Sequence, residues 1–221
     1  MTPARLLLYG GTFDPPHVGH VNNLRAAIEA VQPDRAIVMP AGEPPHKRGS
    51  HAPAELRLAM CGCFAAADPR VEVSRWEIDQ PGPSYTVNTL EMLRAQNPGA
   101  ALYLAVGSDM LLGFTRWYRW QRILQLAALV VQSRTGRDMD ALTAAGAALE
   151  RQGGRIVFAA AVPVPCASSD IRAGSLPPDR LRAALPAPVR RLICENDLYG
   201  LGAYLKNPQH CLILLKSSAC C

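Results

Sequence analysis

Short apolar runs alternate with amphipathic, helix-length stretches along most of this chain, and this alternation limits the folds that it can adopt. The first run, ARLLLYG at residues 4–10, has no charged side chain after Arg5 and ends in glycine. After it, Val21, Leu24 and Ile28 recur at spacings of three and four, as on one face of a helix. Further strand candidates are residues 35–40, 71–74, 101–107, 126–132 and 155–160. Buried strands separated by helices predict a parallel sheet with both faces covered.

The helical stretches indicate one main body with a small helical end. The predicted helices cover residues 19–32, 54–67, 84–96, 170–173, 179–184 and 188–196. Ser84 is the expected N-cap of the third helix, and a surface loop with a short helix is expected within residues 133–154. We therefore predict an α/β protein, a doubly wound parallel sheet in one domain over residues 1–199 with a small helical C-terminal portion. Residues 200–221 are expected to form a flexible C-terminal extension.

Composition narrows the class of protein. The chain has 221 residues, of which 49% are hydrophobic, so it can bury a sizeable core. Its net charge of +5 suits a small anionic ligand but is too modest and scattered for a nucleic-acid surface. Apolar runs are too short to span a membrane and a signal-peptide pattern is missing, so we expect a cytoplasmic protein. The seven cysteines include no C-x-x-C pair, which favours reduced, packed thiols.

The stretch GGTFDPPHVGH at residues 10–20 is the strongest candidate for a site. It leaves the first strand and enters the first helix, at the sheet edge where open α/β proteins bind ligands. Gly10 and Gly11 let the backbone approach a ligand closely, and the helix N-terminus offers unpaired N–H donors. His17 and His20 can add hydrogen bonds to phosphate oxygens. The stretch therefore predicts a phosphate-binding pocket, although it contains neither G-x-G-x-x-G nor a P-loop.

The same stretch resembles the G-x-F-x-P-x-H-x-G-H signature of the nucleotidyltransferase superfamily, whose fold is Rossmann-like. Members of this superfamily join a nucleoside triphosphate to an acceptor that bears a phosphate. The signature alone leaves open nicotinate mononucleotide, phosphopantetheine and alcohol phosphates as acceptors.

Four further segments resemble the bacterial nicotinate-nucleotide adenylyltransferases, in that family's order. They are PAGEPPHKRG at residues 40–49, PSYTVNTL at 83–90, GSDMLLGFTRWYRW at 107–120 and SSDIRAG at 168–174. The last differs from the family's S-S-T-x-I-R at Asp170, which adds a negative charge beside a phosphate site. The resemblance spans residues 6 to 199 and implies an enzyme of NAD biosynthesis that joins ATP and nicotinate mononucleotide.

The resemblance also implies a role for individual residues. Those implied for ATP are Gly10, Gly11, Thr12, Phe13, His17, His20, Gly107, Asp109, Ser168, Ser169 and Arg172. Those implied for the nicotinate nucleotide are Lys47, Thr86, Trp117 and Tyr118, with the indole of Trp117 stacking on the pyridinium ring. His17, His20, Lys47 and Arg172 are the expected catalytic groups. Mg²⁺ is expected to bind mainly to the ATP phosphates, with no metal site built by the protein.

Other interpretations remain open at this stage. A phosphopantetheine adenylyltransferase is the alternative within the same class. A metal hydrolase would use His17, His20 and His46 to hold zinc, and a nucleotide-binding regulator would bind ATP without releasing pyrophosphate. The sequence fixes neither the preference for nicotinate over nicotinamide nor the oligomeric state, and a homo-oligomer is compatible with it.

Overall fold

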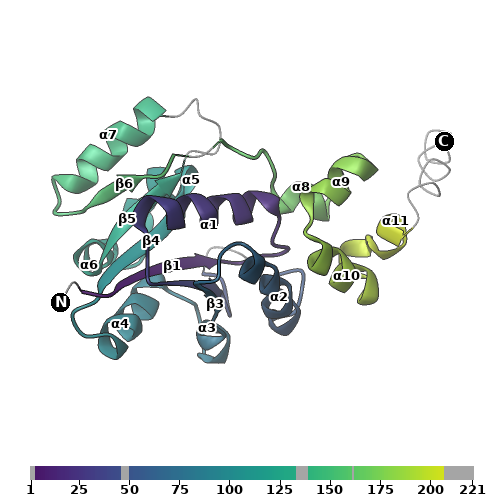
Figure 1. The fold of residues 1–221 in the computed structure, drawn as a ribbon, viewed down its shortest axis with the longest axis horizontal. Coiled ribbons are helices and arrows are strands. Elements are labelled where there is room, and N and C mark those ends of the chain that lie inside the picture. The colour runs from purple at the N-terminus through teal and green to yellow at the C-terminus, as the bar shows by residue number, and fades with distance from the viewer. Residues whose placement is uncertain (1–2, 46–49, 133–138, 161, 207–221) are drawn as a thin grey trace.

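The computed structural model describes residues 3–45, 50–132, 139–160 and 162–206, and its centre is a six-stranded parallel sheet (Figure 1). The strands are β1 (Arg5–Gly11), β2 (Arg35–Pro40), β3 (Val71–Val73), β4 (Ala101–Gly107), β5 (Ala127–Gln132) and β6 (Ile156–Phe158). All five neighbouring pairs run parallel. This confirms the predicted α/β class with a doubly wound sheet.

The strand order, β3-β2-β1-β4-β5-β6, places a switch point at the middle of the sheet. From β1 the chain moves outward through β2 to β3, then returns to β4 beside β1 and moves outward the other way. Leu8 of β1 pairs with Leu104 of β4, so the carboxyl ends of these two strands are neighbours. From these ends the chain continues toward opposite edges of the sheet. In doubly wound sheets the crevice at that point is where ligands bind.

Helices cover both faces of the sheet because successive side chains of each strand point to opposite sides. Leu7 and Tyr9 of β1 join one apolar cluster, and Leu6 and Leu8 join the other. The first face carries α1 (Val18–Val31) and α2 (Ala54–Cys61), and the second carries α4 (Thr86–Gln96), α6 (Trp120–Leu126) and α7 (Met139–Glu150). The remaining short helices before residue 160 are η1 (Gly62–Ala66), α3 (Trp76–Asp79), α5 (Ser108–Leu112) and η2 (Phe114–Arg116).

A helical C-terminal portion packs beyond the end of β1. It consists of α8 (Ser168–Arg172), α9 (Pro178–Ala184), α10 (Ala187–Glu195), η3 (Leu198–Gly200) and α11 (Gly202–Lys206). Figure 1 shows these helices together, at the opposite side of the molecule from α7. Leu201 and Leu205 are buried against this group, and residues 207–221 of the predicted extension lie outside the described residues. No described helix is long and apolar enough to cross a lipid bilayer.

Two local predictions were wrong. Ser84 does not cap α4, whose N-cap is Tyr85, because the Ser84 hydroxyl instead accepts a hydrogen bond from the backbone N–H of Gly42 at 2.9 Å. The helix predicted over residues 54–67 is α-helical only to Cys61 and continues as the 3₁₀ helix η1. The first helix begins at Val18, close to its predicted start, with His17 as its N-cap residue.

Candidate active site

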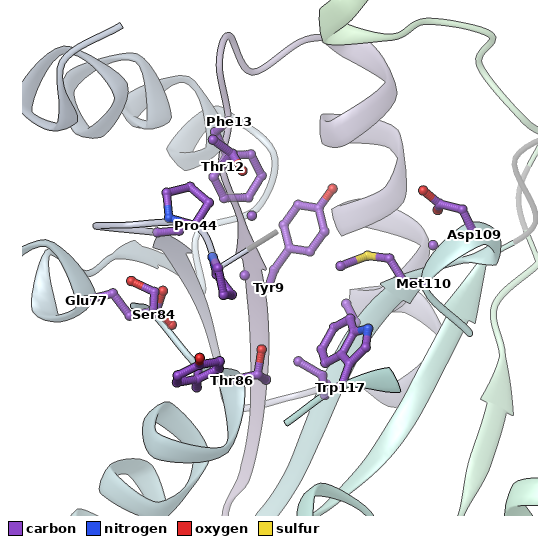
Figure 2. A pocket seen from close by; sticks show the side chains of 18 of the residues that line it. Tyr9, Thr12, Phe13, Pro44, Glu77, Ser84, Thr86, Asp109, Met110 and Trp117 are labelled. Carbon is purple, nitrogen blue, oxygen red and sulfur yellow. The ribbon is translucent and has the colours of Figure 1, made fainter. Parts of the chain in front are cut away.

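A cavity of about 660 Å³ opens at the switch point, where β1 and β4 end. It brings together most of the residues that the sequence singled out. These are Gly10, Gly11, Thr12, Phe13, His20, Thr86, Gly107, Asp109, Trp117, Tyr118 and Ser168. Figure 2 shows Glu77, Ser84 and Thr86 on one side of Tyr9, with Asp109 and Met110 on the other. The cavity therefore has two ends, one beside α4 and one beside the start of α5.

The other predicted residues lie elsewhere. His17 is only 4% exposed and sits behind His20, outside the cavity lining. Ser169 is exposed at the start of α8, and Arg172 donates a hydrogen bond to the backbone carbonyl of Asp14 at 2.6 Å. Neither lines the cavity. Lys47 falls outside the described residues.

The two histidines form one unit at the start of α1. The backbone N–H of His17 donates to Nδ1 of His20 at 3.2 Å, and the two rings lie 3.8 Å apart between centroids. The edge of the His20 ring also packs against Phe13, with 5.3 Å between centroids. Because Nδ1 of His20 accepts a hydrogen bond, the proton of its neutral ring is on Nε2. This arrangement presents an N–H donor beside the helix N-terminus, as phosphate binding requires.

Three glycines in this turn serve different purposes. A Cβ on Gly10 would meet nothing within 4 Å, so its missing side chain leaves open space at the cavity wall. A Cβ on Gly11 would lie 2.9 Å from the Phe13 ring, and one on Gly19 would lie 3.0 Å from the His17 ring. A side chain at Gly11 or Gly19 would therefore press against the Phe13 or His17 ring, whereas Gly10 leaves room for a ligand.

Aromatic side chains frame the end of the cavity beside α4. Thr86 is the first residue of α4, so its backbone N–H belongs to the first turn, where such donors lack helical partners. Trp117 is half-buried and packs against Phe114 at 5.2 Å between ring centroids, which fixes the orientation of the indole. Tyr118 is 54% exposed and packs against Tyr85 at 4.6 Å. A planar apolar wall next to backbone donors suits an aromatic ring that carries an anionic group.

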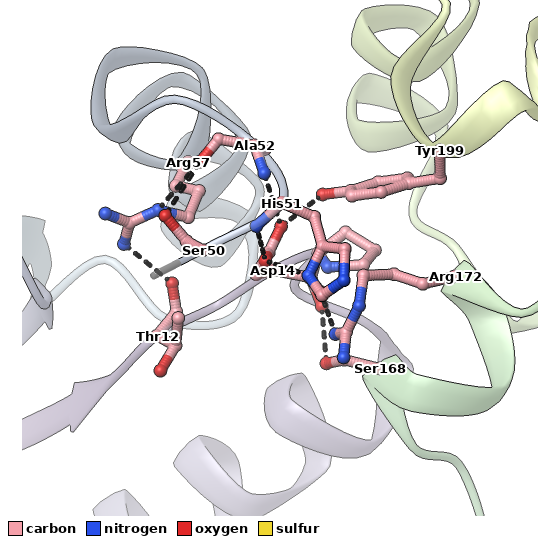
Figure 3. Close-up of polar contacts among 10 residues, drawn as sticks. Thr12, Asp14, Ser50, His51, Ala52, Arg57, Ser168, Arg172 and Tyr199 are labelled. Carbon is pink, nitrogen blue, oxygen red and sulfur yellow. Dashed lines mark hydrogen bonds and ion pairs between the residues drawn. The ribbon is translucent and has the colours of Figure 1, made fainter. Parts of the chain in front are cut away.

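Asp14 lies at the structural centre of the predicted phosphate-binding turn, residues 10–20 (Figure 3). The sequence analysis assigned no role to this residue. Its carboxylate is only 3% exposed and accepts hydrogen bonds from the backbone N–H groups of His51 at 2.7 Å and Ala52 at 3.1 Å. The hydroxyl of Tyr199 donates to it at 2.7 Å, and burial together with this carboxylate raises the pKa of Tyr199. Asp14 thus joins the turn to two segments that are distant in sequence.

Arg57 is a second residue whose role the sequence did not reveal. Its side chain is fully buried, and its guanidinium donates to four backbone carbonyls, those of Thr12, Ala41, Gly42 and Ala52, at 2.6 to 3.3 Å. Burial lowers the pKa of Arg57, while the nearby Asp14 carboxylate raises it. Because its donors are used on carbonyls of the loops after β1 and β2, Arg57 holds these loops together at the cavity floor.

The residues described here contain no group of three or more His, Cys, Asp or Glu side chains that could hold a metal ion. His17 and His20 therefore have no described third ligand, and His46 falls outside the described residues.

Comparison with known proteins agrees with this geometry. Residues 8–174 match the model of the cytidylyltransferase-like family. A Plasmodium falciparum nicotinic acid mononucleotide adenylyltransferase, solved in complex with NaAD, superposes with a TM-score of 0.73 and 15% identity, covering 89% of this chain and 98% of that one. At that identity the likeness concerns the fold. The fold, the family match and the H-x-G-H turn together define this protein as a nucleotidyltransferase.

Relatives with higher identity narrow the class. A protein of Symbiobacterium thermophilum, named probable nicotinate-nucleotide adenylyltransferase, is 35% identical over 198 residues, which cover 89% of this chain and 95% of the relative. A protein of the same name from Acidithiobacillus ferrooxidans is 45% identical over 131 residues, covering 59% of this chain and 60% of the relative. The chain belongs to the nicotinate-nucleotide adenylyltransferase family of enzymes.

Proposed function

We propose that this enzyme transfers the adenylyl group of ATP to nicotinate mononucleotide, forming nicotinate adenine dinucleotide and pyrophosphate for NAD biosynthesis. A phosphate oxygen of the acceptor attacks the α-phosphorus of ATP. The bond from the α-phosphorus to the bridging oxygen breaks, and that oxygen leaves with pyrophosphate. Because the attacking oxygen is already ionised at neutral pH, the protein supplies position and charge stabilisation rather than a nucleophile.

The observation that carries the proposal is the position of His20. It lines the cavity from the first turn of α1. Its Nδ1 accepts a hydrogen bond from the backbone N–H of His17, so the neutral ring donates through Nε2. A donor there stabilises negative charge on the transferred phosphate as the transition state forms. His17, buried behind the ring, supports its orientation.

The remaining roles follow the family resemblance. Ser168 lines the cavity and would contact the departing pyrophosphate together with Ser169 and Arg172. Arg172 donates a hydrogen bond to the Asp14 carbonyl, so it would act on pyrophosphate from that anchored position. Lys47 would contact the incoming and transferred phosphates. ATP would enter as its magnesium complex, with Mg²⁺ held by phosphate oxygens and water, because the described cavity residues offer no carboxylate cluster.

The acceptor would occupy the end of the cavity beside α4. The pyridinium ring would stack on Trp117, and its carboxylate would meet backbone N–H groups near Thr86 and Tyr118. We expect the protein to act in the cytosol. The sequence is compatible with a homo-oligomer. Light scattering on the same preparation measures the oligomeric state.

The test is pyrophosphate release from ATP and Mg²⁺, with nicotinate mononucleotide and nicotinamide mononucleotide assayed side by side. We expect turnover with nicotinate mononucleotide, and a loss of about 100- to 1000-fold in kcat for His20→Ala. Arg25→Ala is the control on the same helix, because Arg25 is exposed and outside the cavity lining, and it should keep kcat within about threefold. Turnover with 4′-phosphopantetheine but with neither mononucleotide would assign the enzyme to the alternative acceptor.

A further inference from the structure

One buried carboxylate that lines the cavity has no part in the proposed reaction. Glu77 of α3 is 7% exposed and faces the end of the cavity beside α4 (Figure 2). Its Oε1 accepts a hydrogen bond from the hydroxyl of Thr89 at 2.5 Å, and the hydroxyl of Ser84 interacts with the same carboxylate. Burial raises the pKa of Glu77, and these two hydroxyl groups oppose that rise. A short hydrogen bond to a buried carboxylate fixes its orientation.

Ser84 extends this contact to the loop after β2. The oxygen of its hydroxyl accepts a hydrogen bond from the backbone N–H of Gly42 at 2.9 Å, and the same hydroxyl interacts with Glu77. The backbone N–H of Ser84 donates to the carbonyl of Glu43 at 2.8 Å, and Glu43 forms an isolated parallel bridge with Pro83. The strip before α4 is therefore docked along the loop that begins at Gly42.

Gly42 in turn connects to the phosphate-binding turn. Its carbonyl accepts from Arg57 at 3.1 Å, and the same guanidinium donates to the carbonyl of Thr12 at 2.9 Å. The fit is close, since a Cβ on Gly42 would lie 2.3 Å from the backbone oxygen of Glu77. Buried and part-buried polar contacts thus connect α4 to the turn that carries the histidines.

This chain of contacts joins the end of the cavity beside α4 to the phosphate-binding turn. An in-line displacement requires the acceptor phosphate and the α-phosphorus of ATP at a set separation, and a misplacement of about 1 Å can cost about 100-fold in rate. We infer that Glu77, Ser84 and Thr89 are positioning residues that hold the acceptor-binding end of the cavity in register with the phosphate-binding turn. The inference rests on the proposed function and adds to it the groups that set acceptor affinity.

Thr89 allows the sharpest test because it is 1% exposed and does not line the cavity. Its hydroxyl therefore reaches the acceptor only through Glu77. Thr89→Val removes the hydroxyl and keeps the shape, whereas Thr89→Ser keeps the hydroxyl. We expect Thr89→Val to raise KM for nicotinate mononucleotide about tenfold while KM for ATP stays within about twofold, and Thr89→Ser to restore acceptor KM to within about threefold of wild type.

Ser84→Ala should reproduce the effect of Thr89→Val, since it removes the hydroxyl that interacts with Glu77 and accepts from Gly42. Thr143→Val is the matched control, because Thr143 is exposed on α7, and it should leave both KM values unchanged. An equal rise of both KM values, or a lower melting temperature without any change in acceptor KM, would show a structural role only and overturn the inference.

The wild-type protein is assayed first, which separates the two proposals. Failure to use nicotinate mononucleotide would count against the proposed function alone, and the same variants would then be compared with 4′-phosphopantetheine. A selective rise in KM for that acceptor would support the positioning role, and unchanged acceptor KM would refute it. A wild type that turns over with neither acceptor would overturn both proposals.

Discussion

Replacing Arg57 by methionine should destabilise this protein strongly, although the change removes no apolar contact area of note. The guanidinium satisfies four backbone carbonyls with its side chain fully buried. At a net value of about 1 kcal/mol for each lost hydrogen bond, Arg57→Met should lower the free energy of unfolding by about 4 kcal/mol. The carboxylate of Asp14 would also lose the positive charge beside it, which adds to the loss.

Arg57→Lys separates charge from geometry. An ammonium keeps the charge beside Asp14, but it cannot reach four carbonyls that a planar fork spans. We expect it to lose about 2 kcal/mol, half the effect of methionine. Arg122→Met is the control, since Arg122 forms a half-exposed ion pair with Glu91 at 3.1 Å and should lose less than about 1 kcal/mol.

The assay is urea unfolding at pH 7 followed by tryptophan fluorescence, with the free energy extrapolated to zero denaturant. A loss of about 4 kcal/mol is a large share of the roughly 5–15 kcal/mol that stabilises a typical domain, so the shift in midpoint should be evident. If Arg57→Met stays within 1 kcal/mol of wild type, water or relaxed loops satisfy the four carbonyls, and the reasoning about this residue is wrong.

Other substitutions test separate parts of the structure. Gly10→Ala should leave the melting temperature within about 2 °C and weaken ATP binding about tenfold by titration calorimetry, because the new Cβ meets only the open cavity. Tyr199→Phe should lower the free energy of unfolding by about 1.5–3 kcal/mol in urea, since it removes a donor from the buried Asp14 carboxylate. Burial raises the pKa of Cys63 from 9.0 to about 12, so the unfolded chain loses this proton near pH 9 while the folded chain keeps it. The free energy of unfolding should therefore fall as pH rises above about 9, and Cys63→Ala should show a smaller fall in unfolding experiments between about pH 8 and 10.

The sheet could be predicted from the sequence because its four central strands are largely buried and read as apolar runs. β1 and β5 are the clearest cases, with Leu7, Leu129 and Val131 fully buried. The helices predicted over residues 170–173 and 179–184 correspond to α8 and α9, whereas α5 and α6 were not predicted. In stretches as short as these, helical periodicity is a weak signal. Tertiary contacts, such as the burial of Ile123, hold these helices in place.

The cavity lining could be predicted where neighbouring residues form one motif, as in the H-x-G-H turn. The residues that hold the turn were missed because their partners are remote in sequence. Tyr199 and Asp14 are 185 residues apart, and Arg57 lies 45 residues from Thr12. In sequence, an arginine inside an amphipathic helix looks like a surface residue. Only the fold brings four loop carbonyls around it.

The location of the buried polar groups follows from the need to keep the cavity open. The buried polar and charged side chains of the described residues are Asp14, His17, Arg57, Glu77, Thr89, Ser108 and Gln132. They lie at strand ends, in loops or near helix starts, whereas the sheet faces are packed with apolar side chains. Loops that border a substrate cavity cannot be held by packing on both sides, because one side must admit the ligand. Their backbone carbonyls and N–H groups still need partners, and buried charged side chains such as Arg57 and Asp14 supply several in a fixed geometry. The same groups thus stabilise the fold and, in the proposed reaction, would hold the loops that position the two substrates.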